Sequence, residues 1–318
     1  MSPLLARAAG APAPGFSHET FAYREDDEFA AVVAAFVREG LAHDEAVVVA
    51  EPPPRLEQLR AALGDDAAAV DFLDMTAIGG NPGRIISVWA AALDRHHRAG
   101  RTLRGVGEPA YPGRSPAELV ECELHELLLN AAFDDGPAWR LLCPYDQGGL
   151  PAEVCERALG THPYRTGADG VLPTGGPGGP TAAELLATSL PPPGEVVLRG
   201  EFGPADVPAV RRTVAQYART SGLTAEQVEA LALAASELAT NSIRHGGGTG
   251  VLAMWNEPGA TVVEFSDAGH LADPLIGRRL PDPPREGGHG VRLVHQLCDL
   301  VQVRSSPAGT TVRVTTWH

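Results

Sequence analysis

The sequence predicts an α/β protein of two domains: an N-terminal open parallel sheet flanked by helices and a C-terminal α/β sandwich. The chain has 318 residues, and a single hydrophobic core usually stops growing at about 250 to 300 residues. Short apolar runs alternate with longer amphipathic stretches in the first half, whereas two consecutive helices precede most strands in the second. A stretch rich in glycine and proline separates the two patterns. We therefore expect domains at residues 16–163 and 195–318, joined by a linker at 164–194.

The first half alternates between predicted strands and helices. Apolar runs of about five residues have the length of buried strands, and longer stretches have helical periodicity. This alternation predicts a parallel sheet with helices packed on it. Ser115 before Pro116 is a capping signal for one helix, and Asp26 or Asp27 is the expected cap of another. The expected strands are 46–50, 69–73, 102–106 and 139–143, and the expected helices are 26–39, 54–63, 83–98, 116–132 and 151–159.

The second half has a different order of elements. Residues 165–194 break every periodicity and leave room for one short helix at 181–189. After them, two helices precede a group of strands, which predicts an antiparallel sheet with helices on one face. The expected strands are 195–202, 250–256, 260–266, 299–305 and 310–316, and the expected helices are 205–219, 224–245 and 290–298.

Charge and hydropathy exclude several classes of partner. Forty acidic residues against 25 basic ones give a formal charge of −15. Such a chain repels a phosphate backbone and an anionic lipid surface, so we expect no direct nucleic-acid partner and no membrane. Residues 1–14 lack the apolar run of a signal peptide, and no segment approaches the roughly 20 apolar residues of a membrane span. We therefore expect a cytoplasmic protein.

The four cysteines predict buried, reduced thiols. They are scattered without C-x-x-C spacing, so neither a disulfide framework nor a zinc ribbon is indicated. Cys122 shares a helix face with His125, and Cys155 lies near His162. Each pair offers two soft ligands, which is short of a four-ligand metal site.

The strongest chemical signal is a polar stripe on the helix expected at 224–245. Glu237, Asn241 and His245 recur every four residues, so a carboxylate, an amide and an imidazole lie along one face. A solvated helix face usually carries lysine and arginine instead. The stripe therefore indicates a binding function.

Two glycine-containing segments follow this helix. The strand at 260–266 runs into Asp267, and Gly269 stands two residues later. A carboxylate at a strand end can accept a hydrogen bond from an amino group of a flat ligand, and a neighbouring glycine lets that ligand approach the backbone. Gly288 and Gly290 open an amphipathic helix, whose free N–H groups and dipole favour a phosphate.

In order and spacing these segments, with the Gly309-Thr310 turn into the last strand, resemble the GHKL family of ATP-binding domains. The resemblance covers residues 195–318 and implies the Bergerat α/β sandwich, with ATP and Mg²⁺ as cofactors. It implies that Glu237 is the general base and that Asn241 holds Mg²⁺ through its side-chain oxygen. Asp267 would bind the adenine amino group. The implied nucleotide-binding residues are Asn241, His245, Asp267, Gly269, Gly288, Gly290 and Thr310.

The chain departs from the family pattern at two places. Leu271 stands where family members often carry a second glycine, and the lid between His270 and Glu286 is rich in proline and arginine. Both departures bear on nucleotide access.

Within that family, the residues Ser-Glu-Leu-Ala-Thr-Asn-Ser-Ile-Arg-His-Gly at 236–246 are most similar to RsbW-like anti-sigma-factor serine kinases. Such kinases bind a sigma factor and phosphorylate a serine of an anti-anti-sigma partner of the STAS type. The resemblance thus implies an ATP-dependent protein serine kinase. Two alternatives remain: a non-catalytic module that sequesters a partner, and a histidine-kinase fragment. The sequence leaves open whether the chain forms a homodimer.

The N-terminal half resembles the MEDS sensory domain, a degenerate RecA/Rossmann-like sheet, through segments such as 104–109 and 143–146. Glu108 follows one expected strand, and Tyr145 and Asp146 follow another, at the carboxyl ends where open α/β sheets bind ligands. One interpretation is a small-molecule sensory site at these three residues. The other is that the neighbouring prolines end the strands and the acids are solvated. No G-x-x-x-x-G-K-[ST] motif occurs, so an intact P-loop is excluded.

Overall fold

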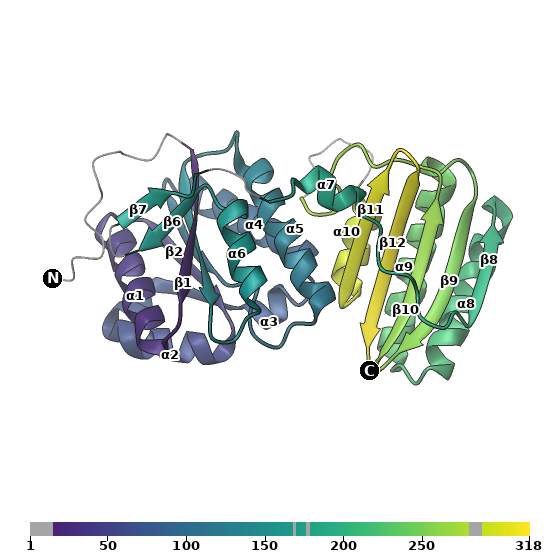
Figure 1. Cartoon of the computed structure of the whole chain (residues 1–318), viewed down its shortest axis with the longest axis horizontal. Coiled ribbons are helices and arrows are strands. Elements are labelled where there is room, and N and C mark those ends of the chain that lie inside the picture. The colour runs from purple at the N-terminus through teal and green to yellow at the C-terminus, as the bar shows by residue number, and fades with distance from the viewer. Residues whose placement is uncertain (1–14, 168–169, 176–178, 280–287) are drawn as a thin grey trace. The chain divides into compact units, whose positions relative to one another are not determined.

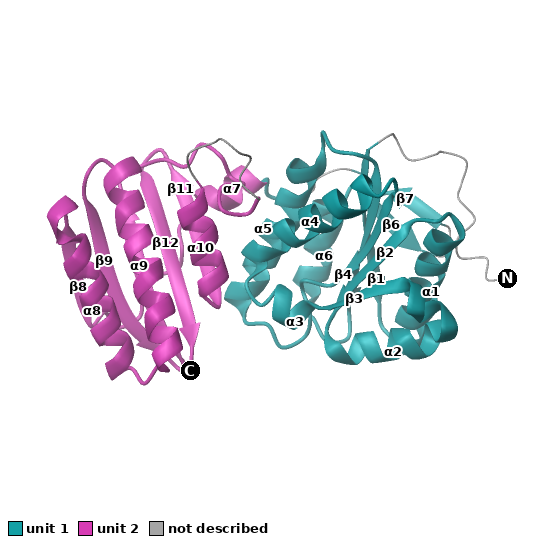
Figure 2. Cartoon of the chain, turned by 180° about the vertical axis from the view of Figure 1, so that it is seen from behind, with its two compact units in different colours: residues 1–181 teal, residues 182–318 magenta. Residues whose placement is uncertain are grey.

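The structure, a computed structural model, describes residues 15–167, 170–175, 179–279 and 288–318. The chain divides into two compact units, residues 1–181 and 182–318 (Figure 2). Unit 1 contains a mostly parallel sheet and unit 2 an antiparallel one, which confirms the predicted fold class.

In the described part of unit 1, the strands form one sheet in the order β3-β2-β4-β5-β1-β6-β7 (Figure 1). Neighbouring strands are parallel except at the edge, where β6 and β7 are antiparallel. The central strand is β5, between β4 and β1, and all of its residues are buried. The strands are β1 (Phe16–Tyr23), β2 (Ala46–Glu51), β3 (Val70–Asp74), β4 (Leu103–Gly107), β5 (Trp139–Asp146), β6 (Tyr164–Gly167) and β7 (Gly170–Pro173).

Helices cover both faces of this sheet (Figures 1 and 2). α1 (Asp26–Ala42) and α2 (Pro53–Leu63) pack on one face, in a core that includes Leu142. On the other face lie α4 (Ile85–Arg98), α5 (Pro116–Phe133) and α6 (Ala152–Thr161), with the short α3 (Met75–Ile78) before them. Trp89 of α4 contacts Trp139 there. Successive residues of a strand point to opposite faces of the sheet. A side chain of the sheet can therefore contact only the helices and strand residues on its own face.

The first residues of α5 and α1 can be compared with the capping residues predicted from the sequence. Ser115 accepts a hydrogen bond from the Glu118 backbone and forms a capping box at the start of α5, as predicted. The predicted cap of α1 is wrong. Glu25 occupies the cap position without a side-chain bond, while Asp26 and Asp27 lie in the first turn, where their charges interact favourably with the helix dipole.

Three strands were not anticipated. β1 has the polar residues His18, Glu19 and Thr20 at its centre, so it lacks the apolar run of a buried strand. β6 and β7 lie within the predicted linker at 164–194. They were not expected there because each has four residues, one of them glycine, and carries little hydrophobic signal. The short helix of that segment is present as α7 (Ala182–Ala187).

Unit 2 has the sheet order β11-β12-β10-β9-β8, with every neighbouring pair antiparallel. Its helices α8, α9 and α10 cover one face (Figure 2), and residues 187–193 cross the other. The elements are β8 (Leu198–Phe202), α8 (Val207–Thr220), α9 (Ala225–His245), β9 (Gly250–Glu257), β10 (Ala260–Asp267), α10 (His289–Leu297), β11 (Leu300–Ser306) and β12 (Gly309–Trp317). Among the described residues of both units, no helix is long and apolar enough to cross a membrane.

Candidate functional site

Helix α9 places the predicted polar stripe beside the first turn of α10. Glu237 and Asn241 are half-buried, and the last helical residue, His245, is exposed. Gly290 lies against the first two. A methyl group on its α-carbon would stand 2.6 Å from Glu237 Oε2 and 3.6 Å from Asn241 Nδ2. The glycine therefore lets the backbone at the start of α10 approach a carboxylate and an amide.

Asp267, the last residue of β10, is held by two donors. The Ser242 hydroxyl donates to Oδ2 at 2.7 Å, and the Gly269 backbone N–H donates to Oδ1 at 2.9 Å. Each oxygen keeps a lone pair for a further donor. Ser242 thus ties the end of β10 to α9, a role that the sequence analysis missed. The available signal was a buried hydroxyl in an otherwise apolar stripe, next to Asn241.

Three glycines allow this close packing. A β-carbon at Gly246 would overlap the Asp267 side chain, and one at Gly269 would overlap the His245 carbonyl. One at Gly309 would overlap the Asp267 carbonyl. Gly269 was predicted to make room for a flat ligand, whereas in the fold it makes room for the His245 carbonyl, and Gly246 and Gly309 are restricted in the same way.

Thr310 lies opposite Asp267 in the β10–β12 pairing. Its hydroxyl donates to the Gly269 carbonyl at 2.9 Å and lies 2.8 Å from the Ser305 hydroxyl. The Leu271 backbone N–H donates to Ser305 Oγ at 2.8 Å, and the Leu271 side chain packs on the core. Thr310 and Leu271 therefore belong to one hydrogen-bonded network beside Asp267.

The segment after Leu271 returns to the start of α10. Gly277 has φ +76°, and its α-carbon faces Val291 of that helix. Gly288, at φ +85°, is the residue before α10. The part of the predicted lid at 280–286 lies outside the described residues.

Two families match the chain. Residues 17–163 match the MEDS family, the methanogen/methylotroph DcmR sensory domain, and residues 201–316 match the histidine kinase-like ATPase domain. The chain therefore carries a MEDS domain followed by a histidine kinase-like ATPase domain. The comparison with curated proteins finds no match.

A crystal structure of the RsbU and RsbW domains of Rv1364c from Mycobacterium tuberculosis is similar to part of the chain. The sequence identity is 16% and the TM-score is 0.29. The match covers 38% of this chain and 32% of that one, so it spans about a third of the solved structure's length.

The ATPase domain contains groups that suit a nucleotide, and its family implies ATP binding. Asn241 carries a side-chain amide oxygen, a hard ligand of the type that Mg²⁺ prefers, and Glu237 lies one helical turn before it. The backbone at Gly290 approaches these two side chains at the N-terminus of α10, an end that favours anions. Asp267 sits at the end of β10, close to Thr310. These contacts fit ATP with a magnesium ion.

In the MEDS domain, two of the three predicted sensory residues lie on the same face of the sheet. Glu108 follows β4, and Asp146 is the last residue of the neighbouring β5. Both side chains lie on the face of the sheet that α1 and α2 cover. The Tyr23 hydroxyl donates to Glu108 Oε1 at 3.1 Å, and Arg55 Nη2 donates to Asp146 Oδ2 at 3.3 Å. Tyr145 is not part of this group, because adjacent residues of β5 point to opposite faces.

A third carboxyl, Glu51 at the end of β2, belongs to the same group and was not predicted from the sequence. Burial raises the pKa of Glu51 well above its usual range, and the charge of Glu108 raises it further. Burial likewise raises the pKa of Glu108 to about 7, although the hydrogen bond from Tyr23 and the charge of Arg55 lower it. Such buried acids can hold a proton near neutral pH or bind a polar ligand.

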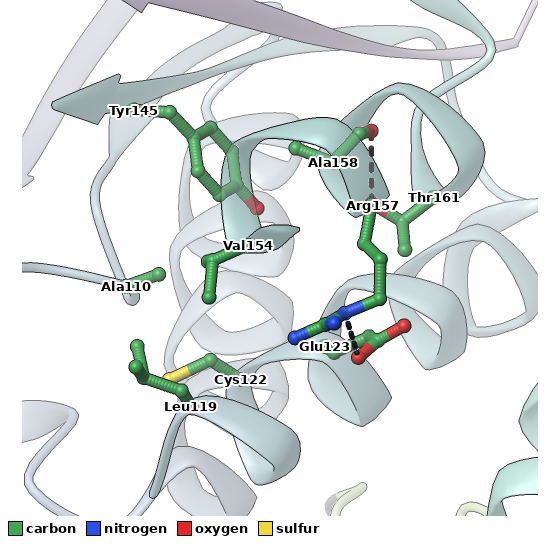
Figure 3. A pocket seen from close by; sticks show the side chains of 9 residues that line it. All are labelled: Ala110, Leu119, Cys122, Glu123, Tyr145, Val154, Arg157, Ala158 and Thr161. Carbon is green, nitrogen blue, oxygen red and sulfur yellow. Dashed lines mark hydrogen bonds and ion pairs between the residues drawn. The ribbon is translucent and has the colours of Figure 1, made fainter. Parts of the chain in front are cut away.

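Tyr145 instead lines a small cavity between β5, α5 and α6 (Figure 3). The volume is about 10 Å³, which is about the minimum for one water molecule. Cys122 lines it, and so do Arg157 and Glu123, whose ion pair joins Nε to Oε2 at 2.8 Å. This cavity is too small for an organic ligand.

Proposed function

We propose that the chain is an ATP-dependent protein serine kinase that acts as an anti-sigma factor in the cytoplasm. It would bind a sigma factor and phosphorylate an anti-anti-sigma partner, while its MEDS domain binds a small molecule. The observation that carries the proposal is the meeting of Glu237, Asn241 and Gly290 at the α9–α10 contact. A carboxylate that can accept a proton and a helix start that can bind phosphate stand together there, and the proposed mechanism uses both.

Each residue has a defined part in this proposal. Asp267 accepts a hydrogen bond from the adenine amino group, while Ser242 and Gly269 keep its carboxylate in place. The backbone at Gly290 orients the phosphates. Asn241 would hold Mg²⁺, which neutralises phosphate charge when bound. Glu237 accepts the proton of the partner's serine hydroxyl as that oxygen attacks the γ-phosphorus and ADP leaves.

The deciding experiment is phosphoryl transfer from radioactive ATP to proteins co-purified from the native cytoplasm. Label on a serine of a small partner is the expected result. Acid-labile label on the chain itself would favour the histidine-kinase alternative. No transfer, together with retained binding of a sigma factor, would favour the sequestering module.

The sensory part of the proposal is tested separately. A ligand for the Glu108 and Asp146 group should change kinase activity, and Asp146→Asn should remove that response while leaving basal transfer intact. Loss of basal transfer in this variant would mean that the residue maintains the fold instead.

A further inference from the structure

Four side chains with metal-binding chemistry meet inside the MEDS domain, on the face of the sheet covered by α5 and α6. His18 comes from β1, Cys143 from the neighbouring β5, Glu126 from α5, and His162 from the end of α6. Thr20, two residues after His18, pairs with Cys143 in the parallel register, so these side chains share a face. None of the four is more than 1% exposed.

The four ligand atoms are close enough to share one ion. All lie within 4.8 Å of one another. Glu126 Oε2 lies 2.9 Å from His18 Nε2 and 3.4 Å from His162 Nε2, and Cys143 Sγ lies 3.4 Å from His18 Nε2. Metal bonds of about 2.0 to 2.3 Å in a tetrahedron separate the ligand atoms by roughly 3.3 to 3.7 Å. Shifts of a few tenths of an ångström in the pairs named above, and of up to roughly 1 Å in the widest pair, would complete that geometry.

Hydrogen bonds on the far side of each ring point its other nitrogen at the cluster. The Asn130 amide N–H donates to the Thr161 carbonyl at 2.8 Å, which leaves Asn130 Oδ1 to accept from His18 Nδ1 at 3.0 Å. His162 Nδ1 donates to the Ala158 carbonyl at 2.8 Å. Outer hydrogen bonds of this kind orient metal-binding histidines. In the neutral rings, both Nε2 atoms carry a lone pair toward Glu126 and Cys143.

The centre of the cluster therefore has an excess of acceptors. His162 Nε2 is buried without a hydrogen-bond partner, and the hydrogen-bond donors to the buried Glu126 carboxyl are the Cys143 thiol and the Tyr145 hydroxyl. Buried acceptors of this kind cost free energy unless a donor or a cation satisfies them. A divalent ion bound to one thiolate, one carboxylate and two neutral imidazoles has no net charge, so it can be buried at little electrostatic cost.

We propose that His18, Glu126, Cys143 and His162 bind one divalent transition-metal ion, with zinc as the best fit. Two nitrogen atoms, one sulfur and one oxygen suit tetrahedral zinc. The Cys143 proton, and any proton on Glu126, passes to solvent as the metal bonds form. With four protein ligands the site is closed, so the ion clamps β1, β5, α5 and the end of α6 together. The site does not depend on the function proposed for the ATPase domain.

The test uses the full chain, with metal content measured by mass spectrometry and cobalt as a spectroscopic substitute for zinc. We expect about one zinc ion per chain. The cobalt form should show a thiolate-to-metal charge-transfer band and the intense visible bands of a tetrahedral site. A chain that takes up no zinc, and whose cobalt form lacks both features, would overturn the proposal.

Matched cysteine variants locate the ligand. Cys143→Ser should abolish the charge-transfer band, whereas Cys122→Ser should keep it, because Cys122 is as deeply buried but bonds to the Pro109 carbonyl outside the cluster. Glu126→Gln, which keeps the side-chain volume, should weaken zinc binding at least tenfold, the lower end of the effect of losing a supporting group. Equal spectra for Cys143→Ser and wild type would sink the assignment, as would loss of the band in Cys122→Ser alone.

Discussion

The polar side chains of the candidate sites differ between the two domains in how deeply they are buried and in how far apart they lie in the sequence. In the ATPase domain, the groups assigned to ATP are half-exposed or exposed and come from short continuous motifs such as 237–245. In the MEDS domain the polar side chains of the two clusters described above are buried, and they come from segments as distant as His18 and His162. A buried polar group needs a hydrogen-bond partner within the fold. An exposed polar group is solvated by water and stays accessible to a ligand. We therefore expect polar substitutions to cost stability in the MEDS domain and activity in the ATPase domain.

The largest effect should follow Glu237→Ala. Loss of the proposed general base should lower phosphoryl transfer by roughly 10² to 10⁴. ATP affinity and unfolding should stay near wild type, because a half-buried carboxylate beside a glycine stabilises little. Steady-state kinetics, calorimetry and denaturation measure the three quantities. Glu229→Ala, an exposed acid on the same helix, is the control. A stability loss with unchanged turnover would reverse the comparison.

Arg140→Ala should show the opposite pattern in the MEDS domain. Arg140 forms two bonds to the buried Glu19 carboxylate, at 2.8 and 3.0 Å. Its removal leaves the buried Glu19 carboxylate without its charged partner and should lower the unfolding free energy by about 3 to 5 kcal/mol. Arg38→Ala breaks a half-exposed pair with Asp66 and should cost less than about 1 kcal/mol. Urea denaturation followed by tryptophan fluorescence compares the two. Equal losses would show that burial does not set the cost.

The pH dependence of MEDS-domain stability should come next in size. The folded-state pKa of Glu108 is raised to about 7 from the usual 4.5, so the folded domain binds a proton that the unfolded chain releases. Proton binding by Glu108 therefore contributes on the order of 3 kcal/mol to the free energy of unfolding. This contribution is complete below about pH 4.5 and is lost as the pH rises through about 7. Glu108→Gln should flatten the decline, leaving the part due to Glu51. Denaturation at a series of pH values measures this, and identical slopes would refute the assignment.

The smallest expected effect is that of Gly290→Ala. The new methyl group would stand 2.6 Å from Glu237 Oε2, so either α10 or the Glu237 side chain must move. We expect ATP affinity to fall by about five- to fiftyfold, corresponding to roughly 1 to 2 kcal/mol. Gly200→Ala on β8, where nothing lies within 4 Å of the added carbon, should change neither affinity nor stability. Titration calorimetry distinguishes them, and full affinity in Gly290→Ala would contradict the phosphate role.

The sequence predicted most where signals are local. Helix α9 was expected at 224–245 and runs from Ala225 to His245, because Thr224 and Gln227 form a capping box ahead of an uninterrupted helical pattern. The close approach of Gly290 to Glu237 depends on packing, and order along the chain alone does not give it. The roles of the site residues stay proposals.

The prediction was weakest where polar residues are buried. β1 was missed because His18 and Glu19 interrupt its hydrophobic pattern, although both are buried in the folded domain. The soft-ligand pairs expected from spacing along the chain are Cys122 with His125 and Cys155 with His162. The fold instead places Cys143 beside His18 and Glu126, since neighbouring strands bring together residues that are far apart in sequence. Tyr145 was grouped with Asp146 by adjacency, which in a strand sends side chains to opposite faces.

The position of β1 in the sheet also constrains how the protein is made. β1 ends at Tyr23, but its neighbours are β5, which begins at Trp139, and β6, which begins at Tyr164. At about 5 to 20 residues per second, a ribosome needs on the order of ten seconds between these points. During that interval the nascent strand has no partner for its backbone groups, and β2, β3 and β4 can form only an incomplete sheet. The complete sheet of this domain can therefore form only after β5 and β6 have been synthesised.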